Sequence, residues 1–226
     1  SGNINNIMTD GNTFFESGVL SDAGRTLNML HGGYRVAENP MIFNNSTYMP
    51  QSSGAALGLG YVEGCNYATV ANNYFVGQSA ADVSNSCPHT MISGNLFYGT
   101  VPGGLSTDQP DNTFTVSAPE NNVSIVRQNE YEPDKGTITI YNWEDLDNVS
   151  IDASEILVEG DTYKIIDAQN YFDDPIATGT YNGTSLSVPM TSTDVAELVG
   201  DDVPVQPEHT GKEFGSFILV KTGHVV

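Results

Sequence analysis

Basic side chains are scarce in this chain of 226 residues. Only 7 Lys and Arg stand against 28 Asp and Glu, which gives a formal net charge of −21 at pH 7. Proteins that bind nucleic acid or an anionic membrane surface need clusters of Lys and Arg to neutralise phosphates. We therefore expect neither partner. An acidic surface of this kind favours solubility, a saline habitat or the binding of divalent cations.

Long apolar runs are also missing, and so are the short signatures of common enzymes. No stretch of 18 or more apolar residues occurs, so we expect no membrane-spanning helix. The sequence contains no nucleophile elbow, Walker loop, zinc-ligand spacing or dinucleotide fingerprint. With 38% hydrophobic residues, the chain is nevertheless long enough to bury a core and to form one or two domains.

What the chain does contain is an internal repeat with a period of 22 residues. Residues 65–77 align with residues 87–99, and the identical pairs are Cys65/Cys87, Asn73/Asn95, Phe75/Phe97 and Gly77/Gly99. A fixed period in the low twenties with strand-forming residues predicts a solenoid, in which each layer buries its apolar side against its neighbours. Leucine-rich repeats have a similar period, but their Leu-x-x-Leu-x-Leu frame is absent.

Weaker copies of the repeat extend it in both directions, around Asn12, Asn39 and Asn112. The spacings between the aligned Asn residues are 27, 34, 22 and 17, as expected if strands keep register while one turn accepts insertions. With its Asn-x-Phe elements, the stretch 1–125 resembles the right-handed parallel β-helix family. The resemblance implies a ladder of hydrogen-bonded Asn side chains and stacked aromatic rings in the interior.

The two cysteines occupy the same position in the aligned repeats. Stacked layers place equivalent residues roughly 4.8 Å apart, which lies within the roughly 4.4–6.8 Å Cα separation of a disulfide. A bridge between Cys65 and Cys87 would link adjacent layers and would suit an oxidising compartment. Two buried, reduced cysteines acting as small apolar side chains are the alternative.

The second part of the chain, residues 126–226, has a different pattern. Residues 118–226 carry 20 acidic and 5 basic side chains, against 8 and 2 in residues 1–117. Short strands are expected at 137–143, 149–151, 162–166, 179–181, 185–188 and 216–220, a spacing typical of an antiparallel β-sandwich. The segments 138–143, 160–172, 179–181, 186–190 and 214–220 resemble the β-sandwich domains at the C-terminus of many secreted carbohydrate-active proteins, which implies an accessory role.

Catalytic residues of a polysaccharide lyase or hydrolase would have few candidates here. The stretch from 21 to 35 holds Arg25 and Arg35, the only basic residues of the first half, together with Asp22 and His31. His31 has an ordinary pKa suited to acid–base catalysis, and Asp22 with Glu38 would supply a carboxylate pair. The spacing matches no known signature, and a long turn with solvated charges is the alternative.

Two kinds of binding site are also candidates. Calcium prefers several carboxylate and carbonyl oxygens, and Asp173 with Asp174 at a strand end is the best pair for it. Exposed aromatic rings stack on sugar rings, although aromatic residues at strand ends also serve packing. The candidates for contact with carbohydrate are Tyr34, Tyr48, Tyr61, Tyr67 and Trp143.

The sequence thus predicts a non-catalytic extracellular element, structural or carbohydrate-binding, that consists of a short parallel β-helix and an acidic β-sandwich. Because the chain begins almost inside a layer, we expect a processed product or fragment whose open edge pairs with another subunit, as in a filament. The alternatives are the C-terminal portion of a polysaccharide lyase or glycoside hydrolase, and a phage or cell-surface adhesin.

Overall fold

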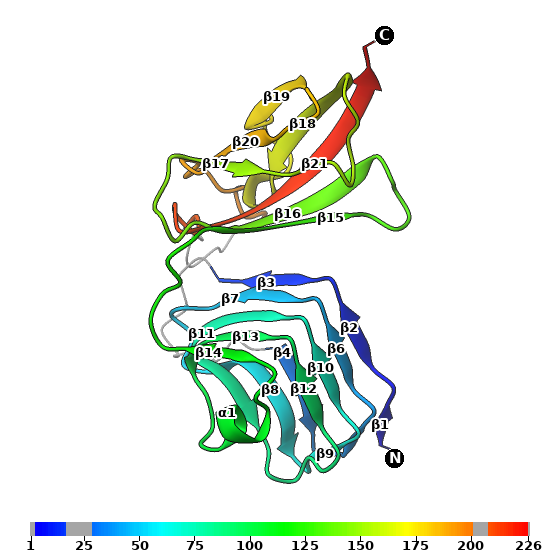
Figure 1. The fold of residues 1–226 in the computed structure, drawn as a ribbon, viewed down its shortest axis with the longest axis vertical. Coiled ribbons are helices and arrows are strands. Elements are labelled where there is room, and N and C mark those ends of the chain that lie inside the picture. Colours follow the sequence, from blue (N-terminus) through cyan, green and yellow to red (C-terminus); the bar gives the residue numbers. More distant parts are fainter. Residues whose placement is uncertain (1–2, 17–28, 201–207, 226) are drawn as a thin grey trace. The chain divides into compact units, whose positions relative to one another are not determined.

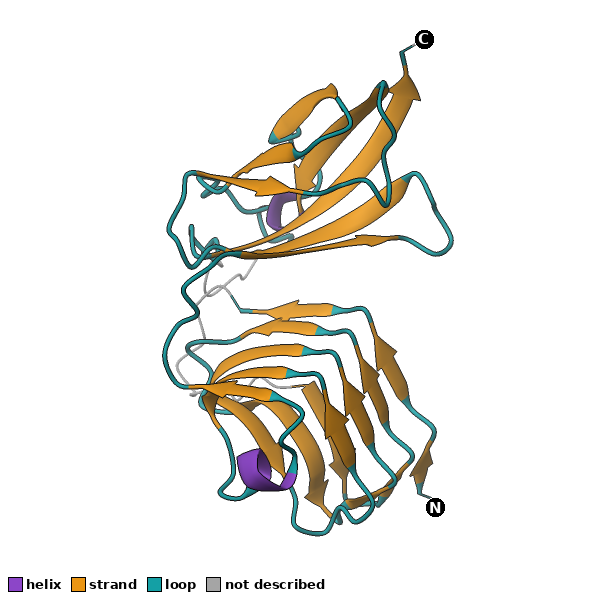
Figure 2. Cartoon of the chain, in the orientation of Figure 1, coloured by secondary structure: helices purple, strands orange, loops and turns teal. Residues whose placement is uncertain are grey.

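The computed structural model describes residues 3–16, 29–200 and 208–225. This part of the chain is all-β apart from two short helices, α1 (Leu105–Asp108) and the 3-10 helix η1 (Ala168–Asn170) (Figure 2). The chain divides into two compact units, Ser1–Ala118 and Pro119–Val226. The strands of the first unit pair in parallel, and those of the second pair antiparallel.

In its described residues, the first unit contains three parallel sheets that the chain visits in turn. The first sheet is formed by β1 (Ile4–Asn5), β5 (Ala37–Glu38) and β9 (Cys65–Asn66). The second sheet is formed by β2 (Met8–Asp10), β6 (Met41–Phe43), β10 (Thr69–Ala71) and β12 (Met91–Ser93). The third sheet is formed by β3 (Thr13–Phe15), β7 (Ser46–Tyr48), β11 (Tyr74–Val83), β13 (Leu96–Thr100) and β14 (Thr113–Thr115) (Figure 1). Two further strands, β4 (Met29–Gly33) and β8 (Ala55–Val62), belong to the same sheet: β4 pairs with β8, and β8 pairs with β11.

The 22-residue alignment is confirmed by the pairing of the strands. Val70 pairs with Ile92 in the second sheet, and Phe75 pairs with Phe97 in the third. Phe75, Phe97 and Phe114 form one interior column, with ring centroids 5.2 and 5.1 Å apart. Each strand therefore pairs with the strand one layer away, and the apolar residues of successive layers bury one another.

The bends between sheets are formed by residues in the left-handed backbone region. The bend between the first and second sheets stacks Asn6, Asn39, Tyr67 and His89, and the bend between the second and third stacks Gly11, Asn44, Asn72 and Gly94; all eight have φ between 50° and 69°. Six of the eight are Gly or Asn, the residue types that adopt this conformation most readily. The bends thus fix the register in which the side chains of successive strands contact one another.

A ladder of asparagine side chains follows the second bend. It consists of Asn12, Asn45, Asn73, Asn95 and Asn112. Each Nδ2 donates to the Oδ1 of the next residue along the ladder, at 2.8–3.3 Å. The assignment of Asn39 to this position was wrong, because Asn39 lies at the first bend, where its Nδ2 donates to Asn6 Oδ1. Asn45 takes the place that the sequence pattern gave to Asn39.

Cys65 and Cys87 form a disulfide, with their Cα atoms 4.4 Å apart. The bridge joins residues 22 positions apart in sequence, so it links one layer to the next. Of the two alternatives that the sequence allows, the structure thus contains the disulfide. A bridge of this kind persists in an oxidising compartment.

The described part of the second unit forms a five-stranded and a two-stranded antiparallel sheet. The larger sheet has the order β15 (Val123–Gln128), β16 (Lys135–Tyr141), β21 (Phe214–His224), β18 (Asp161–Asp167) and β19 (Ala177–Thr180), and the smaller one pairs β17 (Asn148–Ile151) with β20 (Leu186–Pro189). Side chains of both sheets, such as Ile140 and Val188, belong to one buried apolar cluster. Strand β15 was not expected, and it crosses the boundary drawn at residue 125.

Candidate functional site

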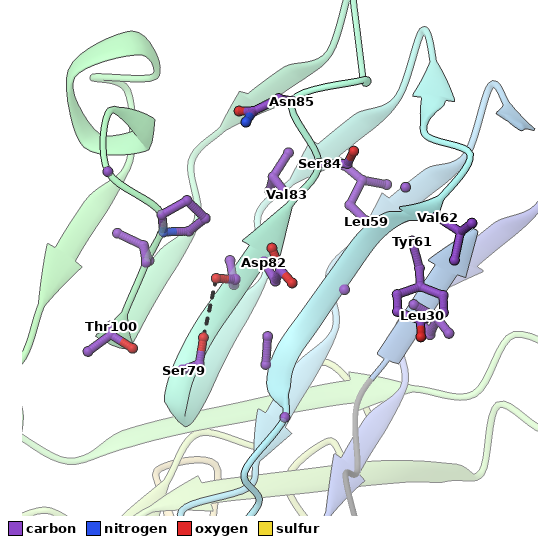
Figure 3. A pocket seen from close by; sticks show the side chains of 18 of the residues that line it. Leu30, Leu59, Tyr61, Val62, Ser79, Asp82, Val83, Ser84, Asn85 and Thr100 are labelled. Atoms are coloured by element: carbon purple, nitrogen blue, oxygen red, sulfur yellow. Dashed lines mark hydrogen bonds between the residues drawn. The ribbon is translucent and has the colours of Figure 1, made fainter. Parts of the chain in front are cut away.

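A groove of about 920 Å³ lies on the third sheet of the first unit (Figure 3). Its floor is formed by β4, β8 and β11, and the segment from Thr100 to Gly103 after β13 lines one side. Because strand residues alternate between the two faces of a sheet, Leu30 and Asp82, which are exposed and line the groove, point away from the buried Leu57, which does not line it. The groove is therefore on the outer face.

The hollow arises from one row of three paired residues. Leu30 on β4 pairs with Gly58 on β8, and Gly58 pairs with Asp82 on β11. Glycine has no side chain, so the middle of the row is empty, with Leu30 next to it on one side and Asp82 on the other. Two strand spacings separate Leu30 from Asp82, roughly 9–10 Å, which is wide enough for a sugar ring to lie between them.

The two sides of the groove differ in chemistry. Leu30, Tyr61 and Val62 form one side, where they are exposed by 45%, 57% and 52%. The opposite side presents Ser79 and Thr100, whose hydroxyl groups donate to Ala81 O at 3.3 Å and to Gln78 O at 3.0 Å and keep lone pairs that can accept from a ligand. Figure 3 shows Asp82 between these two sides. The groove is thus amphipathic across its width, with an aromatic and aliphatic side facing a hydroxyl side and a carboxylate on the floor.

The disulfide holds one end of this groove in place. Gly60, which precedes Tyr61 in the groove, has a φ of +78°, and a Cβ atom there would collide with Cys87 Sγ. Only glycine combines that backbone conformation with such a close approach. The cystine and the strand that carries Tyr61 therefore pack without a gap.

A second hollow of about 330 Å³ continues from the groove. The two share Val83, Ser84, Asn85, Pro102 and Gly103 along their linings. The second hollow adds His89 and Asp108. His89 is stacked on Tyr67 of the preceding layer, with ring centroids 4.9 Å apart. Groove and hollow thus adjoin, and the two together are named the trough; two neighbouring hollows suit an extended ligand better than a single small molecule.

The carboxylates that line the trough give it a negative charge. Among the residues that line it in the described part of the chain, the carboxylates are Asp82 and Asp108, and neither Lys nor Arg is present. A trough of this composition repels a polymer of uronate units and accepts a neutral or cationic one.

The predicted catalytic cluster is not brought together in the groove. His31 lies on β4 but faces the interior, with 6% of its surface exposed and its Nε2 atom 2.9 Å from Thr9 Oγ1. The expectation of His31 in an exposed turn was therefore wrong, because strand alternation directs it inward. Arg35 is exposed and donates from Nη1 to Tyr34 O at 2.8 Å. Asp22 and Arg25 lie outside the described residues.

The environment of His31 gives a prediction for pH dependence. Burial lowers the pKa of His31, and the Met29 backbone opposes this only in part. Below the ordinary His pKa of about 6.5, the unfolded chain binds a proton that the folded chain excludes. Stability of the first unit should therefore fall as pH drops from about 7 to 5. Denaturant unfolding should show a flatter profile for His31→Gln, and equal pH slopes would contradict this account.

Of the five aromatic residues predicted to contact sugars, only Tyr61 lines the groove. Tyr34 is 75% exposed and Tyr67 58% exposed, but neither lines the groove or the adjoining hollow. The prediction for Tyr48 was wrong, since it is 5% exposed on β7. Trp143 is half-buried and stacks on Tyr141, with ring centroids 5.7 Å apart, so its ring serves packing.

The predicted calcium ligands Asp173 and Asp174 lie in an exposed loop after η1. Both oxygens of Asp173 already accept hydrogen bonds, Oδ2 from Asn170 Nδ2 at 2.9 Å and Oδ1 from the Asp174 amide at 2.8 Å. Across residues 3–16, 29–200 and 208–225, no three or more His, Cys, Asp or Glu side chains gather in a way that could hold a metal ion. The calcium assignment therefore gains no support from this geometry.

Two buried carboxylates of the second unit, Asp161 and Asp167, pair with side chains of the same unit. Asp161 accepts from the Val158 amide at 2.9 Å and pairs with Lys221 at 2.9 Å and His224 at 2.8 Å. The Val158 amide and then Lys221 lower the pKa of Asp161 to about 2. Each of these partners belongs to the same unit, so the cluster is a structural one.

Asp167 has a similar role for the irregular segment after residue 190. Burial raises its pKa, but hydrogen bonds from His209 and the Gln169 amide outweigh burial and lower it. The Gly211 amide donates to His209 Nδ1 at 3.2 Å, so the proton of His209 is on Nε2, which donates to Asp167 Oδ2 at 2.8 Å. The pair therefore ties β18 to the segment that leads into β21.

Comparison of the chain with protein-family models, curated proteins and solved structures finds no match. None of the helices in the described residues has the length and apolarity needed to cross a membrane. Function is therefore inferred from the trough itself.

Proposed function

We propose that this chain is a non-catalytic, extracellular element that binds an extended polysaccharide in the trough on the third sheet. The observation that carries the proposal is the difference between the two sides of the groove. A sugar ring has an apolar face and a rim of hydroxyl groups, so Leu30 and Tyr61 match the former, while Ser79 and Thr100 match the latter. The cystine Cys65–Cys87 supports an oxidising, extracellular setting.

The architecture that best accommodates this function is a short right-handed parallel β-helix followed by an antiparallel β-sandwich. Three parallel sheets visited in turn, with stacked Asn and Phe columns, support the first assignment. Two antiparallel sheets that share one apolar cluster support the second. Both units then resemble parts of secreted carbohydrate-active proteins.

A binding function fits the carboxylates of the groove better than hydrolysis does. Glycoside hydrolases use two carboxyl groups, about 5–5.5 Å apart in retaining enzymes and about 6.5–9.5 Å apart in inverting ones. Among the described residues that line the groove, Asp82 is the single carboxylate. The truncated-enzyme alternative differs from this proposal because an enzyme cleaves the bound sugar, which reducing-end and unsaturated-product assays on the purified chain measure. An adhesin leaves the sugar intact, as the proposed element does.

Tyr61→Ala should weaken binding of soluble neutral polysaccharides by about 5- to 30-fold, which corresponds to about 1–2 kcal/mol for a buried aromatic contact. Affinity electrophoresis and calorimetry measure this directly. Tyr34→Ala is the matched control, because Tyr34 is more exposed than Tyr61 but does not line the groove. Equal losses in both variants, or none in Tyr61→Ala, would place the sugar elsewhere.

Self-association is a second candidate function, favoured by the edge strands of the first layer. In the described residues β1 and β2 each pair on one side only, with β5 and β6. Apolar side chains are exposed beside them, including Ile7 at 41% and Met8 at 62%. Unpaired strand edges with apolar neighbours favour the addition of another strand.

The net charge of −21 opposes such pairing, so association should grow with salt, which screens repulsion beyond about 8–10 Å at physiological strength. Light scattering across a salt titration tests this. Met8→Glu should abolish the increase, whereas Tyr131→Glu, which adds the same charge at an 87% exposed site on the second unit, should preserve it. A chain that stays monomeric at all salt concentrations contradicts the candidate.

A further inference from the structure

The trough also indicates which class of polysaccharide it takes. Its floor carries Asp82 in the row between Gly58 and the hydroxyl side, and its extension carries Asp108. Both carboxylates are exposed, and the described lining has no Lys or Arg to neutralise them. A bound polymer therefore meets two negative charges along its length.

Three classes of polysaccharide differ in how they respond to these charges. Uronate polymers bring like charge to Asp82 and Asp108 and are repelled, with the chain's net charge of −21 adding to the effect. Neutral polymers gain from Tyr61 and the hydroxyl side alone. Polymers that carry free amines gain the same contacts and, in addition, charge-assisted hydrogen bonds from ammonium groups to the two carboxylates.

We propose that the trough selects an amino-sugar polysaccharide with free amines, in which protonated amino groups of separate residues pair with Asp82 and Asp108 while a ring packs on Tyr61. This inference rests on the proposed polysaccharide-binding function and assigns its ligand class. The groove supplies room for several sugar rings, and the two carboxylates lie in different hollows of the one trough. Recognition of charge at two points then distinguishes this polymer from its N-acetylated form, which keeps the ring shape but loses the charge.

The test compares short oligomers of β-1,4-linked glucosamine with the same oligomers fully N-acetylated, with cellulose oligomers and with galacturonate oligomers. Binding is measured by calorimetry at a mildly acidic pH, above the ordinary Asp pKa of about 3.9 and below that of the sugar amine. We expect the glucosamine oligomer to bind most tightly, and galacturonate not to bind. The difference in affinity between the glucosamine oligomer and the N-acetylated oligomer should shrink as salt is raised.

Substitutions separate pairing in the trough from attraction by the whole acidic surface. Asp82→Asn should weaken glucosamine binding roughly two- to fivefold, and Asp82→Asn with Asp108→Asn roughly four- to twenty-five-fold, since the two sites act nearly independently. The loss should be larger for the glucosamine oligomer than for the neutral oligomers. The control is the pair Glu130→Gln and Glu155→Gln, which removes the same charge from exposed sites of the second unit and should leave glucosamine binding unchanged.

The outcomes distinguish the two levels of the proposal. If no oligomer binds, the polysaccharide-binding function itself fails. If neutral oligomers bind through Tyr61 and the glucosamine oligomer binds no more tightly than they do, the ligand class is wrong and the binding function stands. The same conclusion follows if the trough variants and the control variants weaken glucosamine binding equally. Tighter binding of a Lys-rich peptide than of the glucosamine oligomer, abolished by the trough substitutions, would assign the trough to a basic peptide and overturn this inference.

Discussion

Phe97→Ala should lower the free energy of unfolding of the first unit by about 3–5 kcal/mol, the usual range for a fully buried phenylalanine. Phe97 is completely buried between two other rings, with Phe75 at 5.2 Å and Phe114 at 5.1 Å between centroids. Removing the middle ring leaves a cavity between two layers whose backbones are held apart by strand pairing on both sides. The layers cannot collapse to fill it, so the full cost is expected.

Denaturant unfolding followed by far-UV circular dichroism measures the loss. The single tryptophan, Trp143, belongs to the second unit, so its fluorescence reports that unit separately. Phe172→Ala is the matched control, because Phe172 is 93% exposed and its truncation should change stability by less than about 0.5 kcal/mol. A near-zero effect of Phe97→Ala would mean that the column of rings does not form.

The repeat could be found in the sequence because two consecutive layers keep the same spacing between their Cys, Asn and Phe residues. Cys65 and Cys87, Asn73 and Asn95, and Phe75 and Phe97 all recur after 22 residues, and all are paired or bonded in the structure. The layer before them differs in two ways. Its ladder residue Asn45 lies 28 residues before Asn73, and the place of the phenylalanine is taken by Thr47.

Thr47 shows why that layer escaped detection. Its hydroxyl group accepts a hydrogen bond from the Val76 amide at 2.9 Å, so a polar side chain is satisfied inside the stack where the pattern requires a ring. With no Asn-x-Phe element in this layer, Asn39 appeared to be the nearest match. Only the pairing of β7 with β3 and β11 reveals the correct register.

The groove was harder to predict than the repeat, because its row is assembled from segments of unequal length. Leu30 and Gly58 are 28 residues apart, and Gly58 and Asp82 are 24 apart, so no fixed period brings them together. Gly58 and Gly60 inside an otherwise apolar strand were the available signal, since glycine in a strand often marks the close approach of a ligand or backbone. Tyr61 was predicted to contact sugar as an aromatic residue of an irregular turn, but it lies in β8, beside neighbours that no sequence pattern indicated.

Asn73→Ala is the second substitution for which we expect a large effect, a loss of about 2–5 kcal/mol. Asn73 is 2% exposed, and its Oδ1 accepts from both the Asn45 amide and Asn45 Nδ2, at 2.8 and 2.9 Å. Its Nδ2 donates to Ile42 O and Asn95 Oδ1. Truncation leaves several of these buried groups without partners, at about 1–3 kcal/mol for each group that water cannot reach.

The ladder contains its own control, because its first member, Asn12, donates the corresponding hydrogen bonds from Nδ2 at an exposed position. Asn12 Nδ2 donates to Asp10 O and Asn45 Oδ1, but Asn12 is solvent-exposed, so water replaces the lost bonds in Asn12→Ala. We expect that variant to lose less than about 1 kcal/mol. Hydrogen exchange should show the difference locally, with the Asn45 amide losing protection in Asn73→Ala and keeping it in Asn12→Ala. Equal destabilisation by the two variants would mean that the ladder contributes through backbone preference at the bend rather than through its buried hydrogen bonds.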